Sequence, residues 1–119
     1  MDWVVRIDTE CRRWYNSLTE LEKASVIAGA ELLMEHGPRL GRPHVDTVEG
    51  SRYPNMKELR VQHAGKPIRI LFAFDPNREA ILLVGGKKAG DDRWYETHIP
   101  IADELFARHL ARIRKKGNK

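Results

Sequence analysis

Cysteine is almost absent from this sequence, which has Cys11 alone among its 119 residues. A single cysteine excludes an intramolecular disulfide and a zinc site built on cysteines, and it is typical of a protein in the reducing cytoplasm. Long apolar runs are missing too, since no segment approaches the roughly 18 consecutive apolar residues of a membrane-spanning helix. The start, MDWVVRIDTE, is acidic too early, and its apolar run is too short, for a signal peptide. We therefore expect a cytoplasmic protein with no membrane partner.

Charges of both signs are plentiful but unevenly distributed. Charged residues make up 32% of the chain and hydrophobic residues 41%, and the length fits one domain, 1–119, with a modest core. Residues 1–56 contain 7 Lys and Arg against 9 Asp and Glu, whereas residues 57–119 contain 14 against 8. This excess favours an anionic partner such as nucleic acid, although the basic tail alone accounts for much of it.

The N-terminal half is typical of one strand followed by two helices. The β-branched run at 3–7 predicts the strand, and Asp8 or Thr9 can cap the first helix. TELE at 19–22 has the pattern of a capping box that opens the second helix, which Gly37 and Pro38 then end. Its spacing predicts an inner face of Leu21, Ala24, Ile27, Ala30 and Met34.

The stretch 39–55 is rich in Gly, Pro and polar residues, and we expect a long surface connection there. Beyond it the hydrophobic period changes from 3.6 to 2. Three short runs, at 57–62, 68–74 and 80–85, are separated by tight turns and predict an antiparallel meander.

A last helix is expected from Pro100, which suits a first helical turn, with Asp103 and Glu104 favourable near its positive end. The order β-α-α-β-β-β-α predicts an α+β fold. In this fold an antiparallel sheet has two N-terminal helices packed on one face, together with a C-terminal helix. We expect the helices to cover only one face of the sheet.

Arg60 and Arg69 fall on neighbouring predicted strands, and each lies between apolar residues. Because side chains alternate along a strand, both arginines point away from their apolar neighbours, toward the expected open face. Guanidinium groups stay charged at any relevant pH, so the pair could hold an anion. The alternative is that Arg60 pairs with Glu58 on a solvated surface. Five further cations could join the pair from strand ends and loops: Lys57, Lys66, Lys87, Lys88 and Arg93.

Three motifs follow one another in this region: LGRP, then MKELRVQHAGKPIRILFAF, then LLVGGKK. Together they resemble the RelE/ParE superfamily of toxins from type II toxin–antitoxin systems, in particular its HigB-like, phage-derived branch. The resemblance covers residues 40–102. It implies a RelE-like microbial RNase fold and a ribosome-dependent mRNA endonuclease, or mRNA interferase, that inhibits translation.

The resemblance also implies catalytic residues. Arg69 is similar to the family's central strand arginine, which stabilises phosphate charge, and Arg60 matches the arginine of the preceding strand. Lys87 and Lys88 match a basic pair after the third strand, and Tyr95 matches a tyrosine near the last helix. Glu58 departs from several ribosome-dependent relatives, which carry lysine there, although glutamate is usual in the HigB-like branch.

Cleavage by the neighbouring 2′-hydroxyl requires a base, an acid and cationic donors on the phosphorane, and electrostatic stabilisation is usually the largest contribution. The base stays open among Lys57, Glu58, His63 and His98. Trp94 could stack on a nucleobase or seal the core. The five histidines show no metal-ligand spacing, so neither a metal nor a cofactor is implied. The predicted substrate-binding residues are Lys57, Lys66, Arg93, Trp94 and His98.

Two alternatives to the nuclease stay open. One is a ParE-like toxin that inhibits DNA gyrase without nuclease activity, and the other is a degenerate homologue that only binds RNA. The expected partners are mRNA, the ribosome and a cognate antitoxin, a helix-turn-helix protein encoded next door. Addition of a strand and insertion of a helix both stay open as modes of antitoxin binding.

Overall fold

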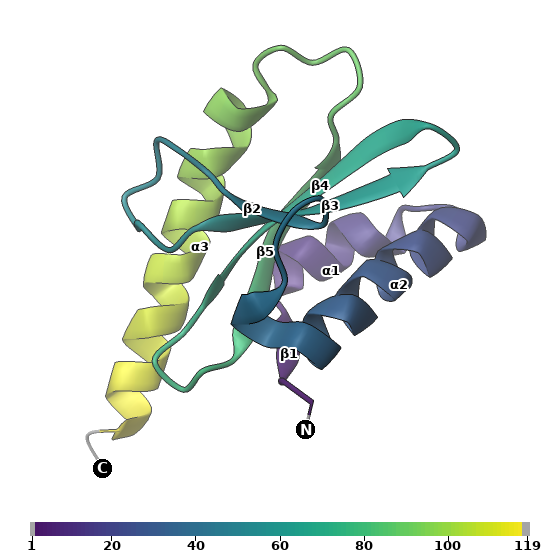
Figure 1. The fold of residues 1–119 in the computed structure, drawn as a ribbon. Coiled ribbons are helices and arrows are strands. Elements are labelled where there is room, and N and C mark those ends of the chain that lie inside the picture. Colours follow the sequence, from purple (N-terminus) through teal and green to yellow (C-terminus); the bar gives the residue numbers. More distant parts are fainter. Residues whose placement is uncertain (1, 118–119) are drawn as a thin grey trace.

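A five-stranded sheet lies at the centre of the structure, a computed structural model that describes residues 2–117 (Figure 1). The strands follow the order β1-β5-β4-β3-β2 across the sheet. Only β1 and β5 pair in parallel, so the sheet is mixed rather than wholly antiparallel. The expected meander forms its centre, and the α+β class is confirmed. The strands are β1 (Val5–Ile7), β2 (Val45–Thr47), β3 (Lys57–His63), β4 (Lys66–Phe74) and β5 (Ala80–Lys87).

The connection expected over 39–55 contains structure of its own. A short 3-10 helix, η1 (Gly37–Arg39), is followed by β2, which pairs antiparallel with β3 and places Val45 opposite Leu59. A three-residue strand is too short to show a period of 2. Its pairing with β3, and not its own sequence pattern, makes it a strand.

Helix α1 (Thr9–Asn16) and helix α2 (Glu20–His36) begin where the capping residues predict. The Asp8 side chain accepts a hydrogen bond from the Glu10 amide, and Thr19 and Glu22 form a reciprocal capping box. Helix α2 ends at Gly37, whose φ of 57° is a left-handed conformation that glycine adopts without strain. Both helices pack against the same face of the sheet.

The inner face of α2 differs from the one expected. Its buried residues are Val26 and Leu33, whereas Leu21 is 73% exposed and Ile27 is 48% exposed. Apolar side chains are spread around this helix, so their period does not single out one face. Gly29 decides the packing because it lets α2 approach the sheet, where a Cβ at this position would lie 3.1 Å from Val61.

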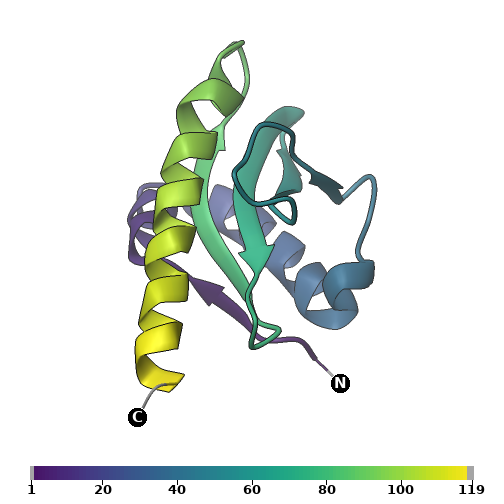
Figure 2. The same ribbon diagram turned by 90° about the vertical axis from the view of Figure 1, so that its left-hand side faces the viewer.

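Helix α3 (Trp94–Gly117) packs on the opposite face of the sheet, as Figure 2 shows. It begins six residues earlier than Pro100, which lies exposed inside it. The expectation that helices cover only one face is therefore wrong, because Ile99, Ala102 and Phe106 bury the second face. Near the N-terminal end of α3, this face of the sheet is left open beside β2 and β3.

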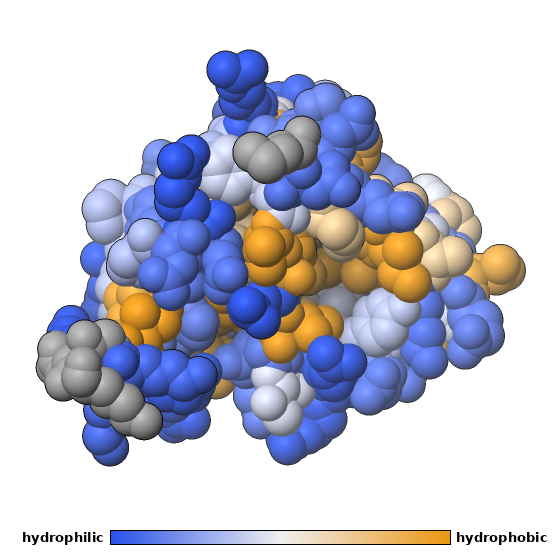
Figure 3. All heavy atoms as spheres, turned by 90° about the horizontal axis from the view of Figure 1, so that it is seen from below, coloured by the Kyte–Doolittle hydropathy of each residue, from blue (hydrophilic) through white to orange (hydrophobic). Residues whose placement is uncertain are grey.

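The first residues of β1 and the last turns of α3 lie at the same end of the molecule (Figure 1). From that end the surface is largely hydrophilic, with apolar side chains gathered near its middle (Figure 3). Within residues 2–117, no helix combines the length and the apolar character needed to cross a membrane.

Candidate active site

Strand pairing brings the two predicted strand arginines together. Arg60 of β3 and Arg69 of β4 are register partners, so they lie directly opposite each other and project from the same face. That face is the one α3 covers farther along, because the alternate residues Leu59, Ile68 and Ile70 belong to the core under α1 and α2. Like charges placed directly opposite on a sheet repel each other, so the pair requires an anion nearby.

Glu58 supplies that anion. It lies two residues before Arg60 on β3 and is only 4% exposed. Its Oε2 accepts a hydrogen bond from Arg60 at 3.1 Å, and its Oε1 lies 3.4 Å from Arg69 Nε. A buried carboxylate is stabilised when cations and donors surround it in this way. One carboxylate thus holds both guanidinium groups in place.

Tyr95 completes the cluster from the first turn of α3. Its hydroxyl donates a hydrogen bond to Glu58 Oε1 at 2.5 Å. Burial raises the pKa of Tyr95 above its ordinary value of 10.0, and the bond to Glu58 and the charge of that carboxylate raise it further. Arg69 opposes this shift. The side chain is therefore a neutral phenol at physiological pH, able to donate a proton.

Asp46 is a member of the cluster that the sequence analysis missed. It lies on β2 opposite Glu58, and its Oδ2 is 3.3 Å from Arg60 and 2.9 Å from Arg42. The hydrogen bond from Arg42 is the main reason that the pKa of Asp46 is lowered. No sequence pattern predicted Asp46 as a site residue, because strand β2 itself was not expected.

All of these residues except Arg69 border an open hollow of about 600 Å³ near the N-terminal end of α3. Its floor carries Glu58, Arg60 and Tyr95, and its outer wall is the chain from Asp46 to Glu49. Lys88 stands beside the hollow, with its Nζ 5.6 Å from the centre of the Tyr95 ring. The hollow is lined by two cations, Arg42 and Arg60, and by three carboxylates, Asp46, Glu49 and Glu58. With the neighbouring Arg69 the charges balance, and Lys88 adds one positive charge.

The other predicted catalytic lysine lies elsewhere. Lys87 pairs with Glu22 of α2 at 2.7 Å, on the opposite side of the sheet from Tyr95. This ion pair, with the capping bond from Thr19, lowers the pKa of Glu22 to about 2. Lys87 and Lys88 are adjacent in sequence, and the alternation along β5 separates them.

The predicted substrate-binding residues are scattered. Lys57 shares the face of Leu59 toward α1 and α2, Lys66 is exposed at the β3–β4 turn, and Arg93 is exposed just before α3. Trp94 is 1% exposed in the core under α3, so its ring has no free face for a nucleobase in this structure. His98 stacks on Trp94 and bonds its carbonyl oxygen.

Of the four residues considered as a base, only Glu58 touches the arginines. His63 bonds Ser25 of α2 through Nδ1 at 2.9 Å, away from the cluster. Within residues 2–117, no group of three or more His, Cys, Asp or Glu side chains is placed to hold a metal ion.

The fold is shared with toxins of known structure. A double mutant of the Escherichia coli toxin RelE in its free state aligns with a TM-score of 0.59 at 12% identity, over 81% of this chain and 94% of that one. The RelBE2 toxin–antitoxin complex of Mycobacterium tuberculosis aligns with a TM-score of 0.56 at 18% identity, over 73% of this chain and 99% of that one. At these identities the likeness establishes a RelE-like fold.

Sequence similarity identifies the family to which the chain belongs. Residues 13–107 match the family described as phage-derived protein Gp49-like (DUF891). HigB2 of Mycobacterium tuberculosis, a protein named as a toxin, is 51% identical over 115 residues, 87% of this chain but only 57% of HigB2. HigB3 of the same organism, also named as a toxin, is 53% identical over 103 residues, 86% of this chain and 89% of HigB3. The chain therefore belongs to the Gp49-like family, is HigB-like in sequence, and has a RelE-like fold.

Proposed function

We propose that this chain is the toxin of a type II toxin–antitoxin system and that it cuts mRNA on the ribosome, in the cytoplasm. The observation that carries this proposal is the Glu58 carboxylate, which joins Arg60, Arg69 and Tyr95 at the floor of an open hollow. The cluster contains a proton acceptor, a proton donor and two fixed cations. These are the groups that cleavage by a neighbouring 2′-hydroxyl requires.

In the proposed reaction the scissile phosphate enters between Arg60 and Arg69 and displaces the Glu58 carboxylate from them. Glu58 then accepts the proton of the 2′-hydroxyl while the 2′-oxygen bonds to phosphorus. Both guanidiniums stabilise the charge of the phosphorane. The bond from phosphorus to the 5′-oxygen breaks as Tyr95 donates its proton to that oxygen. The products are a 2′,3′-cyclic phosphate and a free 5′-hydroxyl.

The bond between Tyr95 and Glu58 gives the site a way to reset. After one turnover the proton from the 2′-hydroxyl resides on Glu58, and Tyr95 has lost its own. The two oxygens are 2.5 Å apart, so the proton passes directly from the carboxyl group to the phenolate. No residue outside the cluster is needed to restore the starting state.

The test of the nuclease is inducible expression with transcriptome-wide mapping of new 5′ ends. We expect Arg69→Ala to lose cutting by about 10²- to 10³-fold, as when one donor to a developing oxyanion is removed. The matched control is Arg13→Ala, which removes an exposed guanidinium from α1, far from the hollow. Growth arrest with no new 5′ ends would contradict the proposed nuclease activity.

The same experiment separates the alternatives. A gyrase inhibitor would give altered supercoiling or DNA breaks and would be insensitive to Arg69→Ala. A binding module that no longer cuts would protect RNA without producing new ends.

Glu58→Gln distinguishes the roles of that residue. The substitution keeps the shape of the side chain but removes its charge and its capacity as a base. As the base, Glu58 is worth about 10²- to 10⁴-fold, so cutting falls by that factor while RNA binding is retained or tightens. If Glu58 only occupies the phosphate site, cutting will rise instead. Single-turnover cleavage and binding of the same oligoribonucleotide measure both quantities.

The proposal includes a cognate antitoxin, encoded next door and carrying a helix-turn-helix domain. It is supported by the two HigB relatives and by the RelBE2 structure, which is itself a toxin–antitoxin complex. Co-expression with the neighbouring reading frame should restore growth, and the two proteins should co-purify. A neighbour that fails to restore growth would exclude it as the antitoxin.

A further inference from the structure

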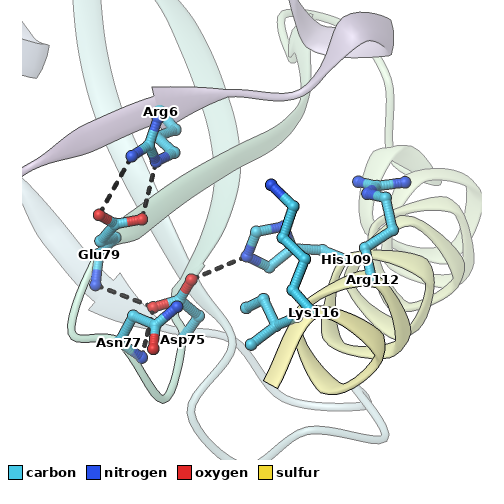
Figure 4. A pocket seen from close by; sticks show the side chains of 8 residues that line it. Arg6, Asp75, Asn77, Glu79, His109, Arg112 and Lys116 are labelled. Carbon is cyan, nitrogen blue, oxygen red and sulfur yellow. Dashed lines mark hydrogen bonds and ion pairs between the residues drawn. The ribbon is translucent and has the colours of Figure 1, made fainter. Parts of the chain in front are cut away.

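A second hollow lies at the other end of α3, bordered by β1, the β4–β5 turn and the last turns of the helix (Figure 4). It encloses about 590 Å³ and is lined by Arg6, Asp75, Glu79, His109, Arg112 and Lys116, among others. Arg112 follows Tyr95 by 17 residues, which at about 1.5 Å per residue places it roughly 26 Å along α3 from the candidate active site. The reaction proposed above uses none of these groups.

The acidic groups of this hollow already have partners. Asp75 is 6% exposed, and its Oδ1 accepts the amides of Asn77 and Glu79. Its Oδ2 lies 2.8 Å from His109 Nε2, which donates to it because a carboxylate can only accept. Glu79 binds Arg6 through both oxygens, at 2.7 and 3.3 Å. The floor of the hollow is therefore fixed: Glu79 is paired with the Arg6 guanidinium, and both oxygens of Asp75 are occupied by hydrogen-bond donors.

The cations on the helix side are less engaged. Among the described residues Arg112 pairs with Asp8 alone, at 3.8 Å, and its side chain is 61% exposed. Lys116 forms no ion pair within residues 2–117 and is exposed. The two lie four residues apart on α3, hence on one face of the helix. In Figure 4 the Lys116 side chain extends across the hollow, between the helix and Arg6.

We propose that this hollow binds a phosphate group, with Lys116 and Arg112 as its main ligands. The planar guanidinium of Arg112 suits two phosphate oxygens, and the flexible Lys116 ammonium adds a third contact. Arg6 keeps donors free besides those that bind Glu79, so it can reach a third side of the ligand. The phosphate can belong to a nucleic acid backbone or to a small phosphorylated molecule.

The test is a titration of the isotope-labelled protein with inorganic phosphate at constant ionic strength, following backbone amide shifts. We expect saturable shifts at Asn77, Glu79, His109 and Arg112. The double variant Arg112→Ala, Lys116→Ala weakens binding by roughly two- to fivefold for each cation removed, since both are exposed. The control is Arg114→Ala, Lys115→Ala, which removes the same charge from the same turns but does not line the hollow.

Two further ligands identify the source of the phosphate. Single-stranded DNA lacks the 2′-hydroxyl, so the proposed nuclease cannot cut it. If the ligand is a nucleic acid backbone, DNA shifts the same amides, and Arg112→Ala, Lys116→Ala reduces the salt slope of DNA binding by about 0.7 for each phosphate that is no longer neutralised. Shifts with inorganic phosphate alone indicate a small phosphate ligand.

Three results would overturn the phosphate site. They are the absence of shifts at the hollow, equal shifts with acetate, and equal weakening in the control variant. None of them bears on the nuclease, because Arg69→Ala and the mapping of 5′ ends report on the other end of α3.

Discussion

Glu58 lies between two arginines that antiparallel pairing places opposite each other, and it contacts both of them and Tyr95. It neutralises Arg60 and Arg69 and accepts the Tyr95 hydrogen bond. In the free protein the carboxylate occupies the position that we assign to a substrate phosphate. Glu58 is an acidic residue within a predicted basic surface, and in this arrangement it holds both arginine side chains in position.

Tyr95 should make stability depend on pH at alkaline values. Its folded-state pKa is raised above 10.0, first by burial and then by Glu58, so the folded protein keeps this proton more tightly than the unfolded chain does. The associated stability is fully present below pH 10 and is lost as pH rises through the folded-state pKa. Urea unfolding of wild type and Tyr95→Phe from pH 9 upward measures the difference.

The control for this measurement is Tyr53→Phe, which removes a phenol at a distance from Glu58. We expect the stability difference between wild type and Tyr95→Phe to shrink as pH rises, and the corresponding difference for Tyr53→Phe to change less. A pH-independent effect of Tyr95→Phe would mean that Glu58 does not retain the Tyr95 proton.

Lys87 is a second residue whose partner determines its role. The pKa of Glu22 is lowered to about 2, chiefly by its hydrogen bond to Lys87, so this carboxylate contributes stability above its usual value of 4.5 and loses it as pH falls toward 2. Lys87→Met should raise the pKa of Glu22 toward 4.5, whereas Lys88→Met should leave it low. Carboxyl chemical shifts followed over this pH range decide between these outcomes.

At the scale of elements, a buried carboxylate of α3 fastens the start of the β2–β3 connection. Asp103 is 5% exposed and accepts hydrogen bonds from Ser51 Oγ at 2.5 Å and from the Arg52 amide at 2.9 Å. The sequence had suggested that Asp103 stabilises the start of a helix, but α3 begins nine residues earlier. Its role is to fasten a loop whose first residues form the outer wall of the candidate active site.

Removing the Asp103 carboxylate should make the outer wall of the candidate active site more mobile. We expect Asp103→Ala to lower the free energy of unfolding by about 1–3 kcal/mol, because the Arg52 amide and the Ser51 hydroxyl lose their acceptor. RNA cutting should fall as well, since Val48 and Glu49 line the hollow. The matched control is Glu96→Ala, which removes an exposed carboxylate from the first turn of the same helix. Equal effects of the two substitutions on amide exchange at 51–53 would contradict the loop contact.

At the scale of the whole molecule, two adjacent glycines let both helical layers approach the sheet. Gly85 faces Trp14 of α1, and Gly86 faces Trp94 of α3, because successive residues of β5 point to opposite sides. A Cβ at Gly85 would overlap the Trp14 ring, and one at Gly86 would lie 2.6 Å from Trp94 Nε1. The glycine pair, conspicuous in the sequence, thus serves packing on two faces at once.

Alanine at Gly85 tests this packing. We expect Gly85→Ala to lower the free energy of unfolding by about 1–3 kcal/mol through overpacking. Gly41→Ala is the matched control, since a Cβ there meets no atom within 4 Å. Thermal or urea unfolding of both variants measures the effect. Equal stabilities would show that α1 can shift to accommodate the methyl group.

Much of the molecule follows from the sequence alone. The caps at Asp8 and Thr19, the three central strands and the alternation that sends Arg60 and Arg69 to one face are local properties, determined by side-chain chemistry and a period of 2. The three motifs were enough to indicate the family. For these features the residues that cause the structure lie within a few positions of one another.

The tertiary structure decided the rest. The bond from Tyr95 to Glu58 joins residues 37 positions apart, and Lys87 meets Glu22 across the sheet. The short strand β2 exists through its pairing with β3, and the buried face of α2 is selected by the fit of Gly29 against Val61. In each case the stabilising contact is long-range. A periodic pattern shows that a residue points one way, but only packing determines what it meets there.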